Sequence, residues 1–276
     1  MKDLLYLRIL YKTAFGRLLL KMFVQPRVSQ KVGQILSCGA SRWLVPYYIR
    51  KHDINMDDIE IPEEGFSSFN EFFTRKRNGE CPSAAKDQLI SPCDGFLTLV
   101  RITKDTVFVV KHTQYYLCDL LKNRGLARKF EGGTALIFRL TPANYHRYCY
   151  PAKGKLLLHR QIPGKLHCVR PVALSSVPVF IQNSREFQVI KTQNFGTMVQ
   201  MEVGALLVGK IENHRKNLSE PYVQAGEEKG YFEFGGSTII LLLQKDKIHL
   251  SRDLRVRRDD NGEIPVHMGE VIALSV

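Results

Sequence analysis

From about residue 89 onwards, short apolar runs alternate with glycine, proline or charged residues. Runs of this length between such breakers are typical of β-strands. The pattern predicts strands at residues 96–102, 106–110, 135–140, 155–158, 187–191, 198–203, 205–211 and 238–243. Between them, only residues 115–122 have a helical pattern, so no long helices alternate with the strands. This disfavours a doubly wound parallel sheet, and we expect a mainly antiparallel β core.

The N-terminal segment has a different pattern. Residues 2–24 are rich in Leu, Ile, Phe and Tyr, interrupted by basic residues that include Arg8, Lys12, Arg17 and Lys21. Basic side chains one helical turn apart favour an interfacial helix that reaches lipid headgroups. Because the apolar residues cover more than one face, a helix packed in the protein core is the alternative. No apolar run approaches the roughly 20 residues that span a bilayer, and no small-residue site typical of signal-peptide cleavage follows.

The helical tendency continues through residues 28–52. Ser68 and Glu71 then form a capping box, which predicts the start of a short helix. The sequence therefore predicts an α+β protein, with a helical N-terminal region over residues 1–60 and a β-rich core over residues 61–276.

Composition changes this picture mainly through charge. The 276 residues include 40 Lys and Arg against 27 Asp and Glu, a formal net charge of +13. Such an excess favours an anionic partner, either nucleic acid or an acidic membrane surface. The basic residues are dispersed and no RNA- or DNA-binding motif is present, which disfavours nucleic acid.

The six cysteines are scattered along the chain. None forms a CxxC pair or a metal-ligand cluster, so we expect no zinc and no other metal site. Scattered thiols fit a reducing compartment better than a disulfide scaffold.

Candidate chemistry begins with the Gly-Gly-Ser-Thr stretch that precedes the apolar run 239–243. Glycine adopts backbone conformations closed to other residues, so Gly236 could hold a strained peptide bond against the Ser237 hydroxyl. Taken alone, the stretch fits a tight turn before a core strand better than a reactive site.

Two other stretches alter that balance. Residues 91–95 read Ser-Pro-Cys-Asp-Gly, and residues 140–148 read Leu-Thr-Pro-Ala-Asn-Tyr-His-Arg-Tyr. Together with the turn at 234–238, and in this order, they resemble the phosphatidylserine decarboxylase family. The resemblance extends to residues 68–75 and 203–211, and so covers nearly the whole chain after the helical region.

The resemblance implies a specific chemistry. Decarboxylation of an amino acid needs an electron sink, and no GxGxxG or Walker motif for an external cofactor is present. In this family the sink is a pyruvoyl group, which here would be made from Ser237 after self-cleavage between Gly236 and Ser237. It would form a Schiff base with phosphatidylserine, and the products would be phosphatidylethanolamine and CO2.

The resemblance also implies roles for two further residues. Asp94 would orient the histidine that activates Ser237, as in a catalytic triad. On its own, an Asp-Gly pair more often indicates a turn aspartate bonded to local backbone. His146 would act near the substrate carboxylate or in the protonation that follows loss of CO2, whereas a lone histidine is more often structural.

One position departs from the family pattern. Family members carry a second histidine three residues after the first, which serves self-cleavage, and this chain has Cys149 there. A thiol replaces imidazole poorly as a base, since its reference pKa is about 8.5 against about 6.5 for histidine. Either His146 does both jobs or another histidine reaches Ser237. The best candidate is His167, in the strand-like segment 164–169, and a packed or surface histidine is the alternative.

We therefore expect a self-processing phosphatidylserine decarboxylase whose cleaved chains stay together as a heterodimer, or as a homodimer of such pairs. It would be peripheral on an anionic membrane, at the cytoplasmic face of the plasma membrane if the source is bacterial. Two alternatives remain. One is a decarboxylase of a related serine-headgroup lipid, and the other is a non-catalytic basic β protein that binds lipid or nucleic acid.

Overall fold

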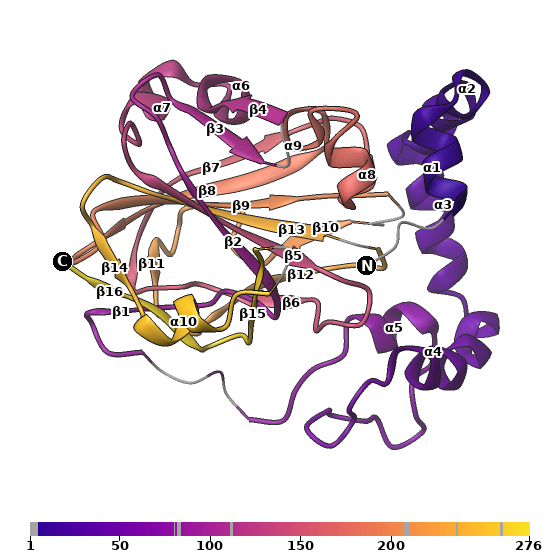
Figure 1. The fold of residues 1–276 in the computed structure, drawn as a ribbon. Helices are drawn as coiled ribbons and strands as arrows, with labels where there is room; N and C mark the ends of the chain where they lie inside the picture. The colour runs from indigo at the N-terminus through magenta and orange to yellow at the C-terminus, as the bar shows by residue number, and fades with distance from the viewer. Residues whose placement is uncertain are drawn as a thin grey trace.

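The computed structural model describes residues 5–79, 81, 84–110, 113–206, 210–235, 237–259 and 262–276. Helices come first and a mostly antiparallel β core follows, which confirms the predicted α+β class (Figure 1). In Figure 1 the N-terminal helices, in indigo, stand to the right of the strands. The division into regions 1–60 and 61–276 stays a prediction.

A sheet of eight antiparallel strands forms the centre of the fold. From edge to edge its strands are β11 (Tyr222–Val223), β7 (Gly154–Ile162), β8 (Arg185–Thr192), β9 (Thr197–Val203), β13 (Ser237–Leu243), β5 (Thr134–Leu140), β2 (Gly95–Arg101) and β15 (Ile264–Val266). All seven residues of β13 are buried, and it pairs with β9 on one side and β5 on the other. Burial on both faces explains why its apolar run is continuous rather than alternating.

Smaller sheets and short helices surround the large sheet. The sheets are β1 (Gln88–Ile90) with β16 (Val271–Ser275) and β14 (Ile248–Leu250), β10 (Ile211–Asn213) with β12 (Glu228–Phe232) and β6 (Arg147–Cys149), and β3 (Val107–Val110) with β4 (Thr113–Tyr116). The short helices are α6 (Leu117–Leu121), α7 (Arg124–Arg128), α8 (Pro171–Leu174), α9 (Val179–Gln182) and α10 (Arg252–Val256).

The N-terminal helices are α1 (Leu5–Lys12), α2 (Ala14–Phe23), α3 (Pro26–Leu36), the 3-10 helix η1 (Gly39–Trp43), α4 (Leu44–His52) and α5 (Phe69–Phe73). The single helix expected over residues 2–24 is broken at Thr13, whose side chain accepts a hydrogen bond from Gly16 N and caps α2. A Cβ on Gly16 would lie 2.0 Å from the Ile9 carbonyl oxygen, so only glycine permits this close turn between α1 and α2.

The first helical segment has one buried face and one exposed face, and its contact with lipid headgroups stays a prediction. Leu7, Tyr11 and Leu20 are buried in the main core. The opposite face exposes large apolar side chains, which are Leu5, Tyr6, Ile9, Phe15, Leu18, Met22 and Phe23. Within the described residues, no helix is both long enough and apolar enough to cross a bilayer.

The predicted capping box is present in part. Ser68 Oγ accepts a hydrogen bond from Glu71 N at 3.2 Å and caps α5. The Glu71 carboxylate, however, accepts from Ser67 N, at 2.5 Å, rather than from Ser68 N.

Three predicted elements differ from the structure. Within 205–211 the described residues enter a strand only at Ile211, because the chain leaves the large sheet after β9. The expected helix 115–122 is shorter, since its first two residues belong to β4. Segment 164–169 is no strand but forms one isolated bridge, because the Asn183 side chain takes up its backbone groups instead. The other predicted strands are confirmed, with ends shifted by up to four residues.

Candidate active site

Ser237 begins the central strand of the large sheet, opposite Leu140 of β5. The residue is completely buried, and its Oγ has no hydrogen-bond partner in the described part of the chain. Leaving a buried hydroxyl unpaired costs about 1–3 kcal/mol. Such a group in a well-packed core needs an explanation, and a chemical role is one of the few available.

The turn before Ser237 is held by the helical region. Phe234 N donates to Asn70 Oδ1 at 3.2 Å, and the Phe234 ring packs edge-on against Phe69 and Phe73 of α5. Gly235 has a φ of 141°, which side chains other than glycine rarely adopt. Gly236, predicted to supply the cleaved carbonyl, lies outside the described residues.

His146 lies beside this turn as a neutral base. Its Nδ1 donates to the Asn144 carbonyl at 2.8 Å, so the neutral ring carries its lone pair on the buried Nε2. Burial, followed by the positive charge of Arg75, lowers the pKa of His146 to about 3. The backbones of Asn144 and Gly235 act in the opposite direction and raise the pKa of His146. The ring therefore lies beside the glycine turn. Its ring packs on Phe73 with centroids 4.0 Å apart.

Asp94 lies in a separate set of contacts. Its two carboxylate oxygens accept from Arg77 at 3.2 and 2.7 Å, and Oδ1 also accepts from Met268 N at 2.9 Å. Asp94 bonds to no histidine in the described residues, although its charge acts to raise the pKa of His146. The role predicted for it in activating Ser237 stays a prediction.

His167 is bound to the N-terminal helices. The Tyr11 hydroxyl lies 3.4 Å from His167 Nδ1, and the backbone of His167 is held by Asn183 through bonds of 2.9 and 2.8 Å. Burial, and then the charge of Lys165, lowers the pKa of His167 to about 4. A hydrogen bond with the Gln182 side chain acts against this shift, and His167 is therefore also a neutral base near pH 7.

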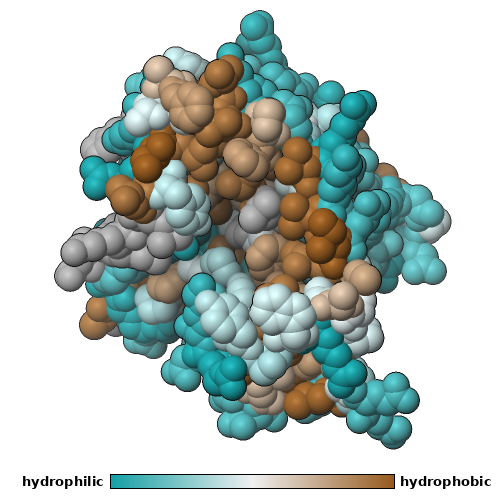
Figure 2. Space-filling view, turned by 90° about the vertical axis from the view of Figure 1, so that its right-hand side faces the viewer, coloured by the Kyte–Doolittle hydropathy of each residue, from teal (hydrophilic) through white to brown (hydrophobic). Residues whose placement is uncertain are grey.

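A cavity of about 230 Å3 opens beside the turn. Phe234 and Gly235 line one side, and Tyr6 and Leu7 of α1 line another. Arg170 also lines it, half-buried, and its guanidinium makes no hydrogen bond or ion pair with the described residues. Figure 2 views the molecule from the side of the N-terminal helices and shows apolar side chains gathered around a hollow in this face. The cavity thus joins the serine turn, an available cation and the exposed apolar face of α1.

Comparison with known proteins identifies the family of this chain. The family model described as phosphatidylserine decarboxylase matches residues 69–274. This chain belongs to the phosphatidylserine decarboxylase family. It is 40% identical to phosphatidylserine decarboxylase proenzyme 2 of Clostridium acetobutylicum over 270 residues, which cover 96% of this chain and 90% of that protein. The proenzymes of Ruminiclostridium cellulolyticum and Clostridium novyi are 38% and 37% identical, covering 96% and 97% of this chain and 90% and 92% of their own lengths.

The structure brings together some of the predicted residues and not others. His146 lies at the glycine turn that precedes Ser237. Asp94 and His167 form hydrogen bonds to neither Ser237 nor each other within the described residues. The individual catalytic assignments therefore stay predictions, and His146 is the one that the geometry of the turn favours.

Three charged residues were not predicted from the sequence. Arg77, which holds Asp94, belongs to an Arg-Lys-Arg run that looks like ordinary polar surface. Lys229 and Glu202 form a fully buried ion pair, with Nζ and Oε2 2.5 Å apart. Burial lowers the pKa of Lys229 and raises that of Glu202. A carboxylate inside an otherwise mostly apolar predicted strand was the available signal for this pair.

Proposed function

We propose that this chain is a self-processing, pyruvoyl-dependent phosphatidylserine decarboxylase that forms phosphatidylethanolamine and CO2. The observation that carries the proposal is the completely buried, unpaired hydroxyl of Ser237 directly behind a glycine turn. Membership of the family, and the proenzyme names of its relatives, support the same function.

Maturation follows from the chemistry of serine at this position. Ser237 Oγ attacks the carbonyl carbon of Gly236, which replaces the peptide bond by an ester. β-Elimination then breaks the Ser237 Cβ–Oγ bond, releases residues 1–236 with a carboxylate, and leaves dehydroalanine. Water converts this group to a pyruvoyl cap with loss of ammonia. His146 Nε2 is the base favoured to take the hydroxyl proton, because this ring is neutral and lies at the turn.

The residues present fit a pyruvoyl group at this position. Ser237 has a hydroxyl that no described residue engages, at the end of a strand that the sheet holds on both sides. Once formed, the group supplies a carbonyl that accepts the electrons left when CO2 departs. The cavity beside Gly235 admits a headgroup, Arg170 offers a positive charge to its phosphate or carboxylate, and the buried surroundings exclude water.

The cleaved chains are proposed to stay together as a heterodimer. After cleavage, β13 would belong to the short chain while both of its partners, β9 and β5, belong to the long one. β15 and β16 of the short chain also pair with strands of the long chain. Separation would break a continuous sheet, so co-elution of both chains under native conditions is expected.

The decisive experiment compares the wild type with Ser237→Ala. The variant should remain a single folded chain without activity, since alanine removes an unpaired buried hydroxyl and leaves the packing intact. Ser219→Ala, at an exposed serine, is the control and should cleave and decarboxylate normally. Denaturing gels, intact mass and CO2 release from phosphatidylserine are the measurements. Decarboxylation by the single-chain Ser237→Ala protein would refute the pyruvoyl assignment.

The maturation base is tested separately with His146→Gln and His167→Gln. We expect His146→Gln to slow self-cleavage strongly and His167→Gln to cleave at close to the wild-type rate. Within the described residues, the backbone of Gly235 acts on His146, whereas His167 contacts Tyr11 and Asn183. Circular dichroism checks that both variants fold. The reverse order of rates would assign the base to His167.

We propose further that the exposed face of α1 and α2 binds an anionic membrane, peripherally, at the cytoplasmic face of the plasma membrane in a bacterial cell. Leu18 and Met22 are 61% and 62% exposed, close to exposed Arg17 and Lys21. Each basic residue near such a surface contributes about 1 kcal/mol. The same face borders the cavity beside the serine turn, so a bound lipid would lie near the site.

Deleting this segment would remove core residues such as Leu7 and Leu20, so substitutions are the cleaner test. Leu18→Ser with Met22→Ser should weaken binding to phosphatidylserine vesicles, and binding should weaken further with salt. Leu157→Ser, at a 48% exposed leucine on β7, is the control. Equal vesicle binding by the double variant and the control would rule out this surface.

A further inference from the structure

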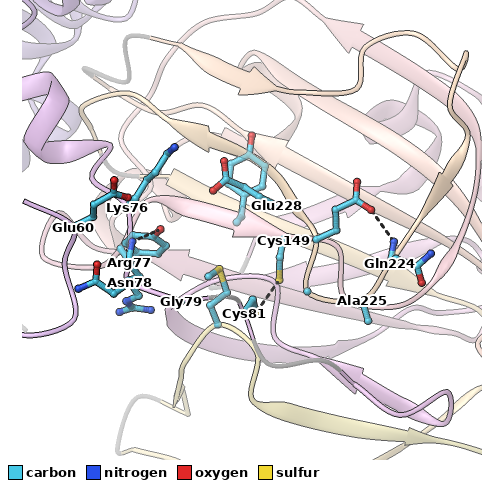
Figure 3. A pocket seen from close by; sticks show the side chains of 15 residues that line it. Glu60, Lys76, Arg77, Asn78, Gly79, Cys81, Cys149, Gln224, Ala225 and Glu228 are labelled. Carbon is cyan, nitrogen blue, oxygen red and sulfur yellow. Dashed lines mark hydrogen bonds between the residues drawn. The ribbon is translucent and has the colours of Figure 1, made fainter. Parts of the chain in front are cut away.

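Away from the serine turn, a larger pocket of about 820 Å3 contains two cysteines that face each other. Cys81 and Cys149 both line it, and their Sγ atoms lie 4.0 Å apart and share a hydrogen bond. Figure 3 shows the two side chains pointing toward one another across the pocket wall. Both are free thiols.

The two thiols have different surroundings. Cys149 ends β6, is buried, and its Sγ also lies 3.8 Å from the Ser91 carbonyl oxygen. Its hydrogen bond with Cys81, and then burial, raises the pKa of Cys149 well above the usual value. Cys81 is half-buried outside any helix or strand, and its hydrogen bond with Cys149 lowers its pKa. Cys81 is therefore the more reactive thiol, with Cys149 directly behind it.

We propose that Cys81 and Cys149 form a thiol–disulfide exchange site for low-molecular-weight disulfides such as oxidised glutathione. The Cys81 thiolate attacks one sulfur of the reagent, whose disulfide bond breaks, and one glutathione thiolate leaves. Cys149 loses its proton and attacks Cys81 Sγ, and the second glutathione leaves as thiolate. The protein loses two electrons, the reagent becomes two thiols, and a Cys81–Cys149 disulfide remains.

The geometry permits this bond with little movement. A disulfide needs its sulfurs about 2.05 Å apart, so these two must approach by about 2 Å. Cys149 is held in strand β6, whereas Cys81 lies outside any helix or strand. Cys81 follows Arg77, which holds Asp94, and Cys149 follows His146. The disulfide would therefore link the segment that carries Arg77 covalently to strand β6, which directly follows His146.

The experiment treats the full protein with oxidised glutathione, alkylates the remaining thiols and maps the peptides by mass spectrometry. We expect two of the six thiols to be lost, with Cys81 and Cys149 peptides linked and the intact mass lowered by two hydrogens. Dithiothreitol should restore both. Unchanged thiols, or a disulfide between any other pair, would overturn the proposal.

Variants separate the two roles. Cys149→Ser should retain a stable glutathione adduct on Cys81, because the resolving thiol is gone. Cys81→Ser should leave Cys149 unmodified, since its thiol is buried and protonated. Cys118→Ser, at a half-buried cysteine on α6, is the control and should form the disulfide as the wild type does. A lasting adduct on wild-type Cys81, with Cys149 still free, would also refute the exchange site.

Discussion

Two buried neutral histidines predict that the proenzyme loses stability in mild acid. The pKa values of His146 and His167 are lowered to about 3 and about 4 in the folded protein, against about 6.5 in the unfolded chain. Below pH 6.5 the unfolded chain binds protons at both positions while the folded chain does not. Stability is therefore present above pH 6.5 and falls as pH drops toward these values.

The expected magnitude follows from linkage. Each histidine lowers the free energy of unfolding by about 1.4 kcal/mol per pH unit in this window. Because each unfolded imidazole is half protonated at pH 6.5, the loss between pH 6.5 and pH 5 is slightly under about 2 kcal/mol for each, or about 3 kcal/mol together. This is a large share of the roughly 5–15 kcal/mol typical of domains. His159 does not cancel the loss. Its hydrogen bond with Glu186 raises the pKa of His159. The stability that this bond adds to the folded protein is therefore fully present below about pH 6.5 and is lost only as the pH rises.

Urea unfolding at pH 5, 5.75 and 6.5 measures the effect, with far-ultraviolet circular dichroism as the signal. The protein should carry Ser237→Ala so that one chain is present throughout. Added His146→Gln or His167→Gln should each reduce the loss between pH 6.5 and pH 5 by about 2 kcal/mol. His249→Gln, at an exposed histidine on β14, should leave it unchanged. If the His146→Gln and His167→Gln proteins lose as much stability between pH 6.5 and pH 5 as the Ser237→Ala parent, burial does not hold these histidines neutral.

The remaining predictions concern the fold around the site. Gly230→Ala should lower stability by about 1–3 kcal/mol in thermal unfolding, because its Cβ would lie 1.9 Å from the Glu212 carbonyl oxygen of the neighbouring strand. Lys229→Met should cost about 3–5 kcal/mol by leaving the Glu202 carboxylate buried and unpaired, and adding Glu202→Leu should recover most of that loss. Asn183→Leu should lower the urea midpoint by the equivalent of about 1–3 kcal/mol, since the His167 and Gly204 carbonyls each lose a donor and the buried His167 N–H loses its acceptor.

Local sequence patterns predict the parts of the fold that depend on local burial. The apolar run 239–243 is a strand because β13 is buried on both faces. Segment 164–169 has similar β-prone residues, yet a side chain distant in sequence, Asn183, takes its backbone hydrogen bonds. The break at Thr13 depends equally on packing, since Gly16 allows α1 and α2 to approach more closely than a side chain would permit. Local pattern cannot distinguish such cases.

The contacts of the candidate site are equally hard to predict from local sequence patterns. Motif order indicates Ser237, Asp94 and His146 individually, because each belongs to a recognisable short stretch. Their partners are distant in sequence or lack a motif, as Arg77 beside Asp94 and Cys81 beside Cys149 illustrate. Contacts of this kind arise only from the tertiary fold.

These contacts bear directly on the departure at Cys149. In this chain the Cys149 thiol faces Cys81, and the Asp94 carboxylate is occupied by Arg77. Neither group offers Ser237 a base that is free to accept a proton. His146 has what the position requires, because its Nδ1 is fixed as a donor and its Nε2 keeps a lone pair. Burial, which lowers its pKa, also keeps that lone pair available at neutral pH. If His146 alone is the base for self-cleavage, Asp94 can stay in its bidentate pair with Arg77. A catalytic triad that includes Asp94 would require Asp94 to leave that pair.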